Sequence, residues 1–377
     1  MDSNESRARA LLGDLSAGCS AVAWETADGG HLWGRNFDFN RIAADSKVTF
    51  VPRGQVFYAC GTELEGNLEP STRCTAAYAA VGIGSLVLRS TPALYEGLNE
   101  KGLMGGQLYY RTFAHFAPEA RPGTLPLQPP FLVTWCLATC ASVEEVARAL
   151  EERVSLVAIP MLGTVPPIHW MFSDRTGESI VVESDRDGLH IYRNTVGVMT
   201  NSPGYPWHRT NLLNHPQLRP LDYGELAWGG ERLEPCFSGS GLQGLPGDFS
   251  SPSRFVRLCF LRALTPRAAG EAEGVTRLLH LFASAAFPLG AAEVGEPGEP
   301  IESDEGVVPW DYTIYTAVFC AESGRYYWTS YENPRVQFVE LSALKNLTEM
   351  AQFDLGRAPD FLCRTQGPCA QRAPALK

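Results

Sequence analysis

A cysteine and a set of polar side chains stand close together near the start of this chain. Residues 18–39 read GCSAVAWETADGGHLWGRNFDF, in which Cys19 opens the segment and Arg35 and Asp38 stand near its end. Charged side chains are rarely buried without a partner. An arginine that faces a cysteine lowers the pKa of its thiol, and a carboxylate can hold an amine beside it. The pattern predicts a nucleophilic cysteine, with a cysteine that only packs in the core as the alternative.

Cleavage of the bond between Gly18 and Cys19 would place a thiol and a free α-amine on one residue. An α-amino group has a pKa of about 7.7–8.0, so much of it is neutral near physiological pH. A thiol with a pKa of about 8.5 is only slightly ionised at neutral pH, yet it is strongly nucleophilic. Cys19 would then act as both nucleophile and base without a catalytic histidine. Asp38 would orient the ammonium group, and Arg35 would favour the thiolate.

The segment ahead of Cys19 has the composition of a removable leader. Residues 1–18, MDSNESRARALLGDLSAG, are polar and charged. They lack the apolar core of about 7–15 residues that a secretory signal contains, so the SAG before Cys19 resembles a signal cleavage site only superficially. We expect a propeptide and a cytoplasmic protein. Initiation further downstream would still require processing, because no methionine lies just before Cys19.

The composition limits the classes of partner. The 377-residue chain is 45% hydrophobic and 19% charged, which suits one large globular domain. Its formal net charge of -11, without a basic stripe, argues against nucleic acid and against an anionic membrane surface as partners. No stretch reaches the roughly 18 apolar residues that span a bilayer. The longest apolar stretch, PFLVTWCLATCA, occupies only residues 130–141.

Neither the cysteines nor the histidines form a metal-binding pattern. The 10 cysteines contain no CxxC pair and the 7 histidines no HExxH pattern, so we predict no metal and no cofactor. Cys136 and Cys140 are expected to be core thiols on one face of a helix. Cys363 and Cys369 would pair only in an oxidising compartment.

The elements that must position Cys19 are strands. Asp28 and Gly29 provide a tight turn, so residues 19–39 are expected to form a β-hairpin. Periodicity predicts further strands within 47–60, 93–110, 155–200 and 311–333, and helices over about 131–153, 251–264 and 272–287. Ser142 begins a capping-box pattern that would divide the first of these helices into two. The order lacks a regular βαβ alternation and favours an α+β fold with antiparallel sheets and helices outside them.

No linker divides the chain convincingly. We expect residues 1–18 to be a leader, residues 19–345 to form one catalytic domain and residues 346–377 to be a loosely attached tail. Residues 292–306 are acidic and rich in glycine and proline, which is typical of a loop.

Five blocks of sequence, in the same order, resemble the choloylglycine hydrolase family of bile salt hydrolases and penicillin V acylases. The blocks are CSAVAWETADGGHLWGRNFDFNR at 19–41, LYEGLNEKGLMGGQLYY at 94–110, VGVMTNSP at 196–203, GLPGDFSSPSRFVR at 244–257 and DYTIYTAVFCAESGRYYWTSYEN at 311–333. The resemblance implies an N-terminal-nucleophile hydrolase with a four-layer αββα sandwich of two mainly antiparallel sheets. It also implies hydrolysis of a linear amide through an acyl-enzyme, and often a homotetramer. The 18-residue leader departs from the commonest pattern, in which a methionine or a very short propeptide precedes the cysteine.

The same resemblance assigns roles within the hairpin. Cys19 matches the nucleophile that becomes the N-terminus on maturation. Arg35 and Asp38 match the arginine and aspartate that contact the thiol and the amine of that cysteine.

Two further residues enter the predicted site through the resemblance. Asn201 matches the asparagine whose side chain helps to form the oxyanion hole, and one such preorganised donor contributes roughly 10²–10³ in rate. Arg254 matches the arginine that completes the polar set, with Arg257 as the competing choice. Without the ordered blocks, Asn201 would be a turn-capping residue and Arg254 an arginine on the face of a helix.

The identity of the amide depends on position 109. Tyr109 stands where bile salt hydrolases tend to carry asparagine and penicillin V acylases tyrosine, and an aromatic wall suits a flat phenoxyacetyl group. A tyrosine that merely packs between strands is the simpler alternative. The resemblance thus favours a penicillin V acylase-like enzyme for a small-molecule amide, with a bile salt hydrolase or a hydrolase of another N-acyl amide as alternatives.

Two other functional classes remain. The first is a non-catalytic member of the fold that binds amphipathic amides, although a pure binder would not need the five polar residues of the predicted site. The second is a papain-like protease, which expects a catalytic histidine and a helix that begins CGSCW. Because GCSAVAW reads as a strand, the sequence argues against that class.

Overall fold

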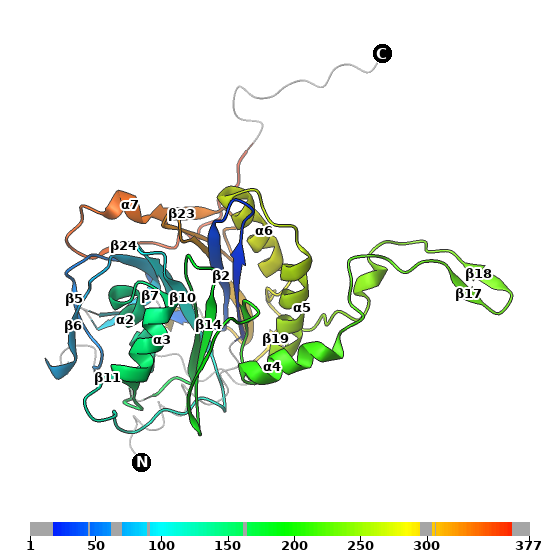
Figure 1. Cartoon of the computed structure of the whole chain (residues 1–377). Coiled ribbons are helices and arrows are strands. Elements are labelled where there is room, and N and C mark those ends of the chain that lie inside the picture. Colours follow the sequence, from blue (N-terminus) through cyan, green and yellow to red (C-terminus); the bar gives the residue numbers. More distant parts are fainter. Residues whose placement is uncertain are drawn as a thin grey trace.

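The computed structural model of this chain describes residues 18–43, 46–61, 70–88, 91–160, 164–294, 304–305 and 307–363. Two large sheets stack face to face, with helices on the outer side of each (Figure 1). This is the four-layer αββα sandwich, and the predicted α+β fold is confirmed. In the described ranges, no helix is both long and apolar enough to cross a bilayer. Most of the expected leader and Cys369 lie outside the described residues.

The first sheet carries the predicted hairpin. Its seven strands follow the order β16-β1-β2-β21-β22-β23, and β19 pairs with β21. They are β1 (Gly18–Glu25), β2 (His31–Phe39), β16 (Val198–Met199), β19 (Ala292–Glu293), β21 (Trp310–Cys320), β22 (Arg325–Ser330) and β23 (Gln337–Glu340). Gly29 adopts a φ of 86° in the turn between β1 and β2, which glycine does without steric cost. The expected hairpin is therefore confirmed.

The second sheet contains nine strands in the order β15-β14-β13-β10-β9-β7-β4-β24, and β8 pairs with β7. They are β4 (Lys47–Val51), β7 (Ala80–Leu88), β8 (Thr91–Leu94), β9 (Glu96–Asn99), β10 (Met104–Tyr109), β13 (Ile168–Ser173), β14 (Ser179–Asp185), β15 (Gly188–Tyr192) and β24 (Ala351–Phe353). The strands predicted within 155–200 are present, but they do not form one antiparallel meander, because residues 154–156 pair with residues 125–127 outside this sheet. Since Met199 pairs with Ala21, β16 crosses to the first sheet instead of extending the second.

Short strand pairs and helical turns complete the chain. The strands are β3 (Ile42–Ala43), β5 (Val56–Tyr58), β6 (Arg73–Thr75), β11 (Leu125–Leu127), β12 (Val154–Leu156), β17 (Leu226–Trp228), β18 (Glu231–Leu233) and β20 (Asp304–Glu305). The 3-10 turns are η1 (Pro70–Thr72), η2 (Pro129–Phe131), η3 (Leu212–Asn214) and η4 (Ser240–Leu242). The hairpin β17–β18 stands on an arm that extends away from the sandwich (Figure 1).

The described residues contain six α-helices. They are α2 (Leu132–Thr139), α3 (Val143–Glu152), α4 (Tyr205–Asn211), α5 (Ser251–Leu264), α6 (Glu271–Ala283) and α7 (Leu341–Leu344). Helix α2 packs on the second sheet, whereas α5 and α6 pack on the first. The predicted helix over 131–153 is divided, because the Ser142 side chain accepts a hydrogen bond from the Glu145 nitrogen and caps α3. Cys136 and Cys140 are buried, as expected of core thiols.

Part of the expected C-terminal tail belongs to the sandwich. Strand β24 pairs with β4 at the edge of the second sheet. The Trp328 indole nitrogen donates to the Leu355 carbonyl oxygen at 2.9 Å, and Arg357 forms an ion pair with Glu332. The prediction of a loose tail from residue 346 onwards is therefore wrong for residues 351–357, because backbone pairing and these contacts hold them against the sandwich. Residues 364–377 lie outside the described part of the chain.

Candidate active site

Cys19 and Arg35 lie on neighbouring strands and contact each other directly. In the ladder between β1 and β2, Cys19 pairs with Phe37 and Ala21 pairs with Arg35. Alternate residues of a strand share a face, so the thiol and the guanidinium project to the same side. The Arg35 Nη2 atom donates to the Cys19 sulfur at 2.7 Å, and both side chains are buried. The hairpin register thus brings together the predicted thiol and arginine.

Glu96 holds Arg35 from the other sheet. Its Oε2 atom accepts from Arg35 Nη1 at 3.2 Å, and the Gln107 carbonyl oxygen accepts from the same nitrogen at 2.7 Å. The hydroxyls of Tyr315 and Tyr326 also donate to Glu96, each at 2.8 Å. Glu96 is absent from the predicted site. A glutamate inside the apolar stretch LYEGL was an available signal, because a charge there needs a partner.

Asp38 lies beside Gly18, the residue that precedes Cys19. It pairs with Gly18 across the hairpin and is fully buried. Its Oδ1 atom accepts from the Thr313 hydroxyl at 2.5 Å, and its Oδ2 atom has no hydrogen-bond partner among the described residues. Thr313 is a further residue that the sequence did not indicate. The contact between Asp38 and a free α-amine stays a prediction, since Cys19 is joined to Gly18 here.

Asn201 and Arg254 come from distant segments and meet at the backbone of Cys19. The Asn201 Oδ1 atom accepts from the Cys19 nitrogen at 2.8 Å and from Arg254 Nη2 at 2.7 Å. Arg254 also donates to the Cys19 carbonyl oxygen at 2.5 Å and to the Ser20 hydroxyl at 2.8 Å. Asn201 Nδ2 donates one of its two hydrogens to the Tyr109 carbonyl oxygen at 2.9 Å. An amide nitrogen carries two hydrogens, and the role of the second in an oxyanion hole stays a prediction.

The structure distinguishes between the two candidate arginines of α5. Arg254 contacts Cys19, whereas Arg257 donates to the carbonyl oxygens of Pro246 and Asp248. Three residues along a helix correspond to a rise of about 4.5 Å, which is enough to take Arg257 past Cys19. Arg254 is therefore the residue that joins the predicted site.

Burial opposes ionisation of the thiol. It raises the pKa of Cys19; Arg35 counteracts this shift, and the carboxylate of Asp38 adds to it. Burial also raises the pKa of Asp38 to about 7, against the opposing effect of Arg254. Burial would lower the pKa of Arg35, but Cys19 and Glu96 outweigh it, and that pKa is raised. The thiol thus lies next to a permanent cation that favours its ionised form.

An apolar cavity of about 270 Å³ opens at Cys19. Cys19, Arg35 and Asp38 line it together with the apolar side chains of Phe37, Phe39, Ile42, Tyr95, Tyr109 and Ile168. An apolar cavity with a few convergent polar groups is typical of a small-molecule site. Tyr109, predicted to be a wall of the substrate site, lines this cavity and contributes its carbonyl oxygen to the Asn201 contact.

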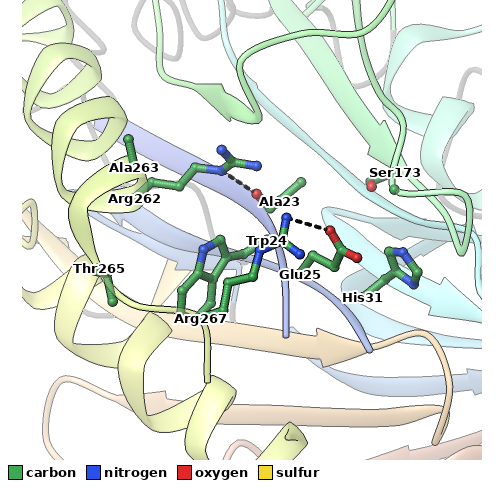
Figure 2. A pocket seen from close by; sticks show the side chains of 10 residues that line it. Ala23, Trp24, Glu25, His31, Ser173, Arg262, Ala263, Thr265 and Arg267 are labelled. Atoms are coloured by element: carbon green, nitrogen blue, oxygen red, sulfur yellow. Dashed lines mark hydrogen bonds and ion pairs between the residues drawn. The ribbon is translucent and has the colours of Figure 1, made fainter. Parts of the chain in front are cut away.

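A second cavity, of about 240 Å³, lies at the opposite end of β1 (Figure 2). Arg262 donates there to the Ala23 carbonyl oxygen at 2.6 Å, and Arg267 forms a 3.0 Å ion pair with Glu25. Glu25 is six positions from Cys19, which corresponds to about 20 Å along a strand. No cysteine is among the residues that line this polar cavity, so Cys19 does not face it. Of these two cavities, the apolar one is lined by the predicted nucleophile.

A comparison with protein families identifies the family of this chain. The family described as "Linear amide C-N hydrolases, choloylglycine hydrolase family" matches residues 19–353. The chain belongs to the choloylglycine hydrolase family. It is a linear amide C–N hydrolase, and the predicted family and enzyme class are confirmed. The match begins at Cys19, the predicted nucleophile.

Individual members of the choloylglycine hydrolase family and solved structures extend the comparison. The chain is 33% identical over 326 residues to a bile salt hydrolase/transferase of Clostridium perfringens, covering 86% of this chain and 92% of that protein. It is 31% identical over 326 residues to the corresponding protein of Lactiplantibacillus plantarum, with the same coverages. A mutant conjugated bile acid hydrolase from C. perfringens superposes with a TM-score of 0.78 at 30% identity, covering 92% of this chain and 99% of that one. Penicillin V acylase from Agrobacterium tumefaciens superposes with a TM-score of 0.67 at 20% identity, covering 90% of this chain and 92% of that one. This likeness supports the fold alone.

Proposed function

We propose that this chain is an N-terminal cysteine amidohydrolase that acts on a non-peptide amide through a thioester acyl-enzyme. The observation that carries the proposal is the Cys19 thiol on the wall of the apolar cavity, 2.7 Å from Arg35 Nη2. The sulfur attacks the amide carbonyl carbon, the C–N bond breaks, and the leaving amine takes up the thiol proton through the α-amine. Water then attacks the thioester, the C–S bond breaks, the carboxylic acid is released, and the Cys19 thiol is restored.

The proposed mechanism requires the removal of residues 1–18. While the leader is attached, the Cys19 nitrogen is a peptide amide that donates to Asn201 and cannot accept a proton. Cleavage turns it into an amine with a pKa of about 7.7–8.0, which suits a base near neutral pH. The Oδ2 atom of Asp38 has no hydrogen-bond partner among the described residues, which supports this step, because a buried carboxylate oxygen benefits from a new donor.

We infer that the acyl group is apolar and contains rings. A conjugated bile salt is the first candidate, since the relatives named above are bile salt hydrolases. In addition, transfer of a sterol skeleton from water into an apolar cavity is favourable. Penicillin V is the second candidate, because the cavity wall includes Tyr109, against which a phenoxyacetyl ring would pack. This order reverses the sequence-based preference, since the penicillin V acylase neighbour is only 20% identical.

The decisive experiment compares the wild type with Cys19→Ala by intact mass and by hydrolysis of glycine- and taurine-conjugated bile salts and of penicillin V. We expect the wild type to lack residues 1–18 and to release the free acid. Cys19→Ala should retain the leader and lose at least about 10³-fold in rate, as expected when a nucleophile is removed. Cys236→Ala is the matched control, because that cysteine is exposed and lies outside the cavity. An active Cys19→Ala variant would contradict the proposal.

A further inference from the structure

The residue in front of Cys19 is closely enclosed. Gly18 is buried at the start of β1. A Cβ atom placed on Gly18 would lie 2.7 Å from the Cζ atom and 2.9 Å from the Cε2 atom of Phe287, and 3.4 Å from the Cβ atom of Asp38. Carbon atoms in favourable contact are about 3.5–4.0 Å apart, so the first two distances are severe overlaps. Position 18 has no room for a side chain unless a neighbour moves.

Phe287 is held in place from several sides. Its nitrogen donates to the Thr313 hydroxyl at 2.8 Å, and its carbonyl oxygen accepts from the Thr313 nitrogen at 3.1 Å. Its ring centroid lies 5.0 Å from that of Phe249, and the Arg254 guanidinium lies 5.2 Å above the ring. Only 5% of Phe287 is exposed. A larger residue at position 18 would therefore displace the Gly18 backbone more readily than the ring.

Asp38, Thr313 and Phe287 form a connected group, which we call the glycine collar. The Thr313 hydroxyl accepts from the Phe287 nitrogen and donates to Asp38 Oδ1, so one side chain joins the other two. Asp38 is paired with Gly18 in the hairpin, and its Oδ2 atom has no partner among the described residues. The collar thus encloses the acyl side of the Gly18–Cys19 bond and holds an acceptor oxygen beside it.

We propose that the glycine collar restricts the residue before Cys19 to glycine and thereby determines which leader can be removed. The inference rests on the proposed N-terminal cysteine mechanism. In the cleavage, the Cys19 sulfur attacks the Gly18 carbonyl carbon, the C–N bond breaks, and the nitrogen gains the thiol proton to become the α-amine. Water then attacks the resulting thioester, the C–S bond breaks, and the leader leaves with a carboxyl group on Gly18 while the thiol is restored.

The steric assignment makes a quantitative prediction about side chains at position 18. A methyl group there forces the reacting carbonyl away from the sulfur or forces the Phe287 ring outward. A displacement of about 1 Å at a reacting centre can reduce the rate about 100-fold. Removing part of the ring should provide the missing space and restore cleavage. Gly18→Ala should therefore be slow, Gly18→Val slower, and Gly18→Ala combined with Phe287→Leu or Phe287→Ala faster than Gly18→Ala alone.

The experiment follows leader loss by intact mass during cell-free synthesis of the full chain. We expect the wild type and the control Gly224→Ala, where an added Cβ atom meets nothing within 4 Å, to lose residues 1–18 at equal rates. Gly18→Ala should retain its leader about 100 times longer. Its thermal unfolding should match that of unprocessed Cys19→Ala, which shows that the precursor is folded. The two Phe287 double variants should recover at least part of the rate.

The outcomes separate this inference from the proposed function. Cleavage of Gly18→Ala at the wild-type rate would overturn the glycine collar and leave the nucleophile assignment intact. If the Gly18→Ala precursor is folded and neither Phe287 substitution speeds the loss of its leader, the steric role of the Phe287 ring is also contradicted. A wild-type chain that keeps its leader, or a Cys19→Ala chain that loses it, would instead contradict self-cleavage by Cys19.

Discussion

The buried charges around Cys19 form one connected set. Arg35 donates to the thiol on one side and to Glu96 on the other, and Glu96 also accepts from two tyrosine hydroxyls. A buried ion pair is costly to separate, because the remaining charge is left without compensation. Glu96 is therefore a positioning residue, which keeps the guanidinium directed at the sulfur.

Replacing Glu96 by glutamine tests this dependence on charge. The Glu96→Gln variant keeps the shape of the side chain but leaves Arg35 without its counter-charge. We expect the free energy of unfolding to fall by about 3–5 kcal/mol, measured by urea denaturation of the Cys19→Ala background so that processing does not differ. Tyr326→Phe, which removes a single hydroxyl from the same carboxylate, should cost only about 1 kcal/mol. Equal losses for the two variants would show that the charge of Glu96 is unimportant.

At the scale of elements, strand register positions one part of the site and helix placement positions the other. The ladder between β1 and β2 places Arg35 beside Cys19, whereas β16 and α5 deliver Asn201 and Arg254 from the side. A histidine of α4 supports this second group. His208 Nε2 donates to the Asn201 carbonyl oxygen at 2.9 Å, and its ring stacks on Phe255 at 4.6 Å. The neutral ring thus connects α4 and α5 to the loop that carries Asn201.

This contact should make stability depend on pH. Burial lowers the pKa of His208 from 6.5 to about 4. Because the unfolded chain binds the proton first, unfolding becomes easier as the pH falls from 6.5 to 4, by up to about 3 kcal/mol. Below that range this contribution no longer changes. In urea denaturation across this range, the free energy of unfolding should rise more steeply with pH in the wild type than in His208→Gln. The raised pKa of Asp38 acts in the opposite direction, but it is common to both proteins and does not affect the difference. His280→Gln, at an exposed position of α6, should leave the slope unchanged.

At the scale of the whole molecule, the arm between α4 and α5 is the least compact of the segments that the structure describes. It extends from the sandwich and ends in β17–β18 (Figure 1). Several of its large apolar side chains are exposed, namely Leu213, Leu221, Leu226, Trp228, Leu233 and Phe237. Exposed apolar groups gathered in this way are typical of an interaction surface. We propose that a second copy of this chain covers the arm, in line with the homo-oligomer that the resemblance implies.

The oligomer can be tested on the arm itself. We expect light scattering of the wild type at micromolar concentration to give a multiple of the chain mass. The double variant Trp228→Ser and Phe237→Ser should shift this mass toward the monomer, because it removes two exposed apolar anchors. Phe361→Ser removes an equally exposed ring outside the arm and should leave the mass unchanged. A monomeric wild type would refute the proposed assembly, while the cytoplasmic location stays a separate prediction.

Local sequence was sufficient for the hairpin and much of the helical structure. The Asp28-Gly29 turn and strand alternation place the Cys19 thiol and the Arg35 guanidinium on one face, and α5 occupies the predicted range 251–264. These features depend on neighbours within a few residues, so the sequence determines them directly. The ordered blocks added Asn201 and Arg254 by resemblance.

Only the tertiary structure decided which distant residues complete the site. Glu96 reaches Arg35 across 61 positions, Asn201 reaches Cys19 across 182, and Arg254 reaches Cys19 across 235. Such contacts depend on how the two sheets stack and where β16 crosses between them, and periodicity carries no information about either. The same holds for Phe287, which encloses Gly18 only because α6 and β21 bring it there. The sequence by itself therefore determined that Cys19, the predicted nucleophile, lies beside Arg35, and the stacking of the sheets decided what surrounds them.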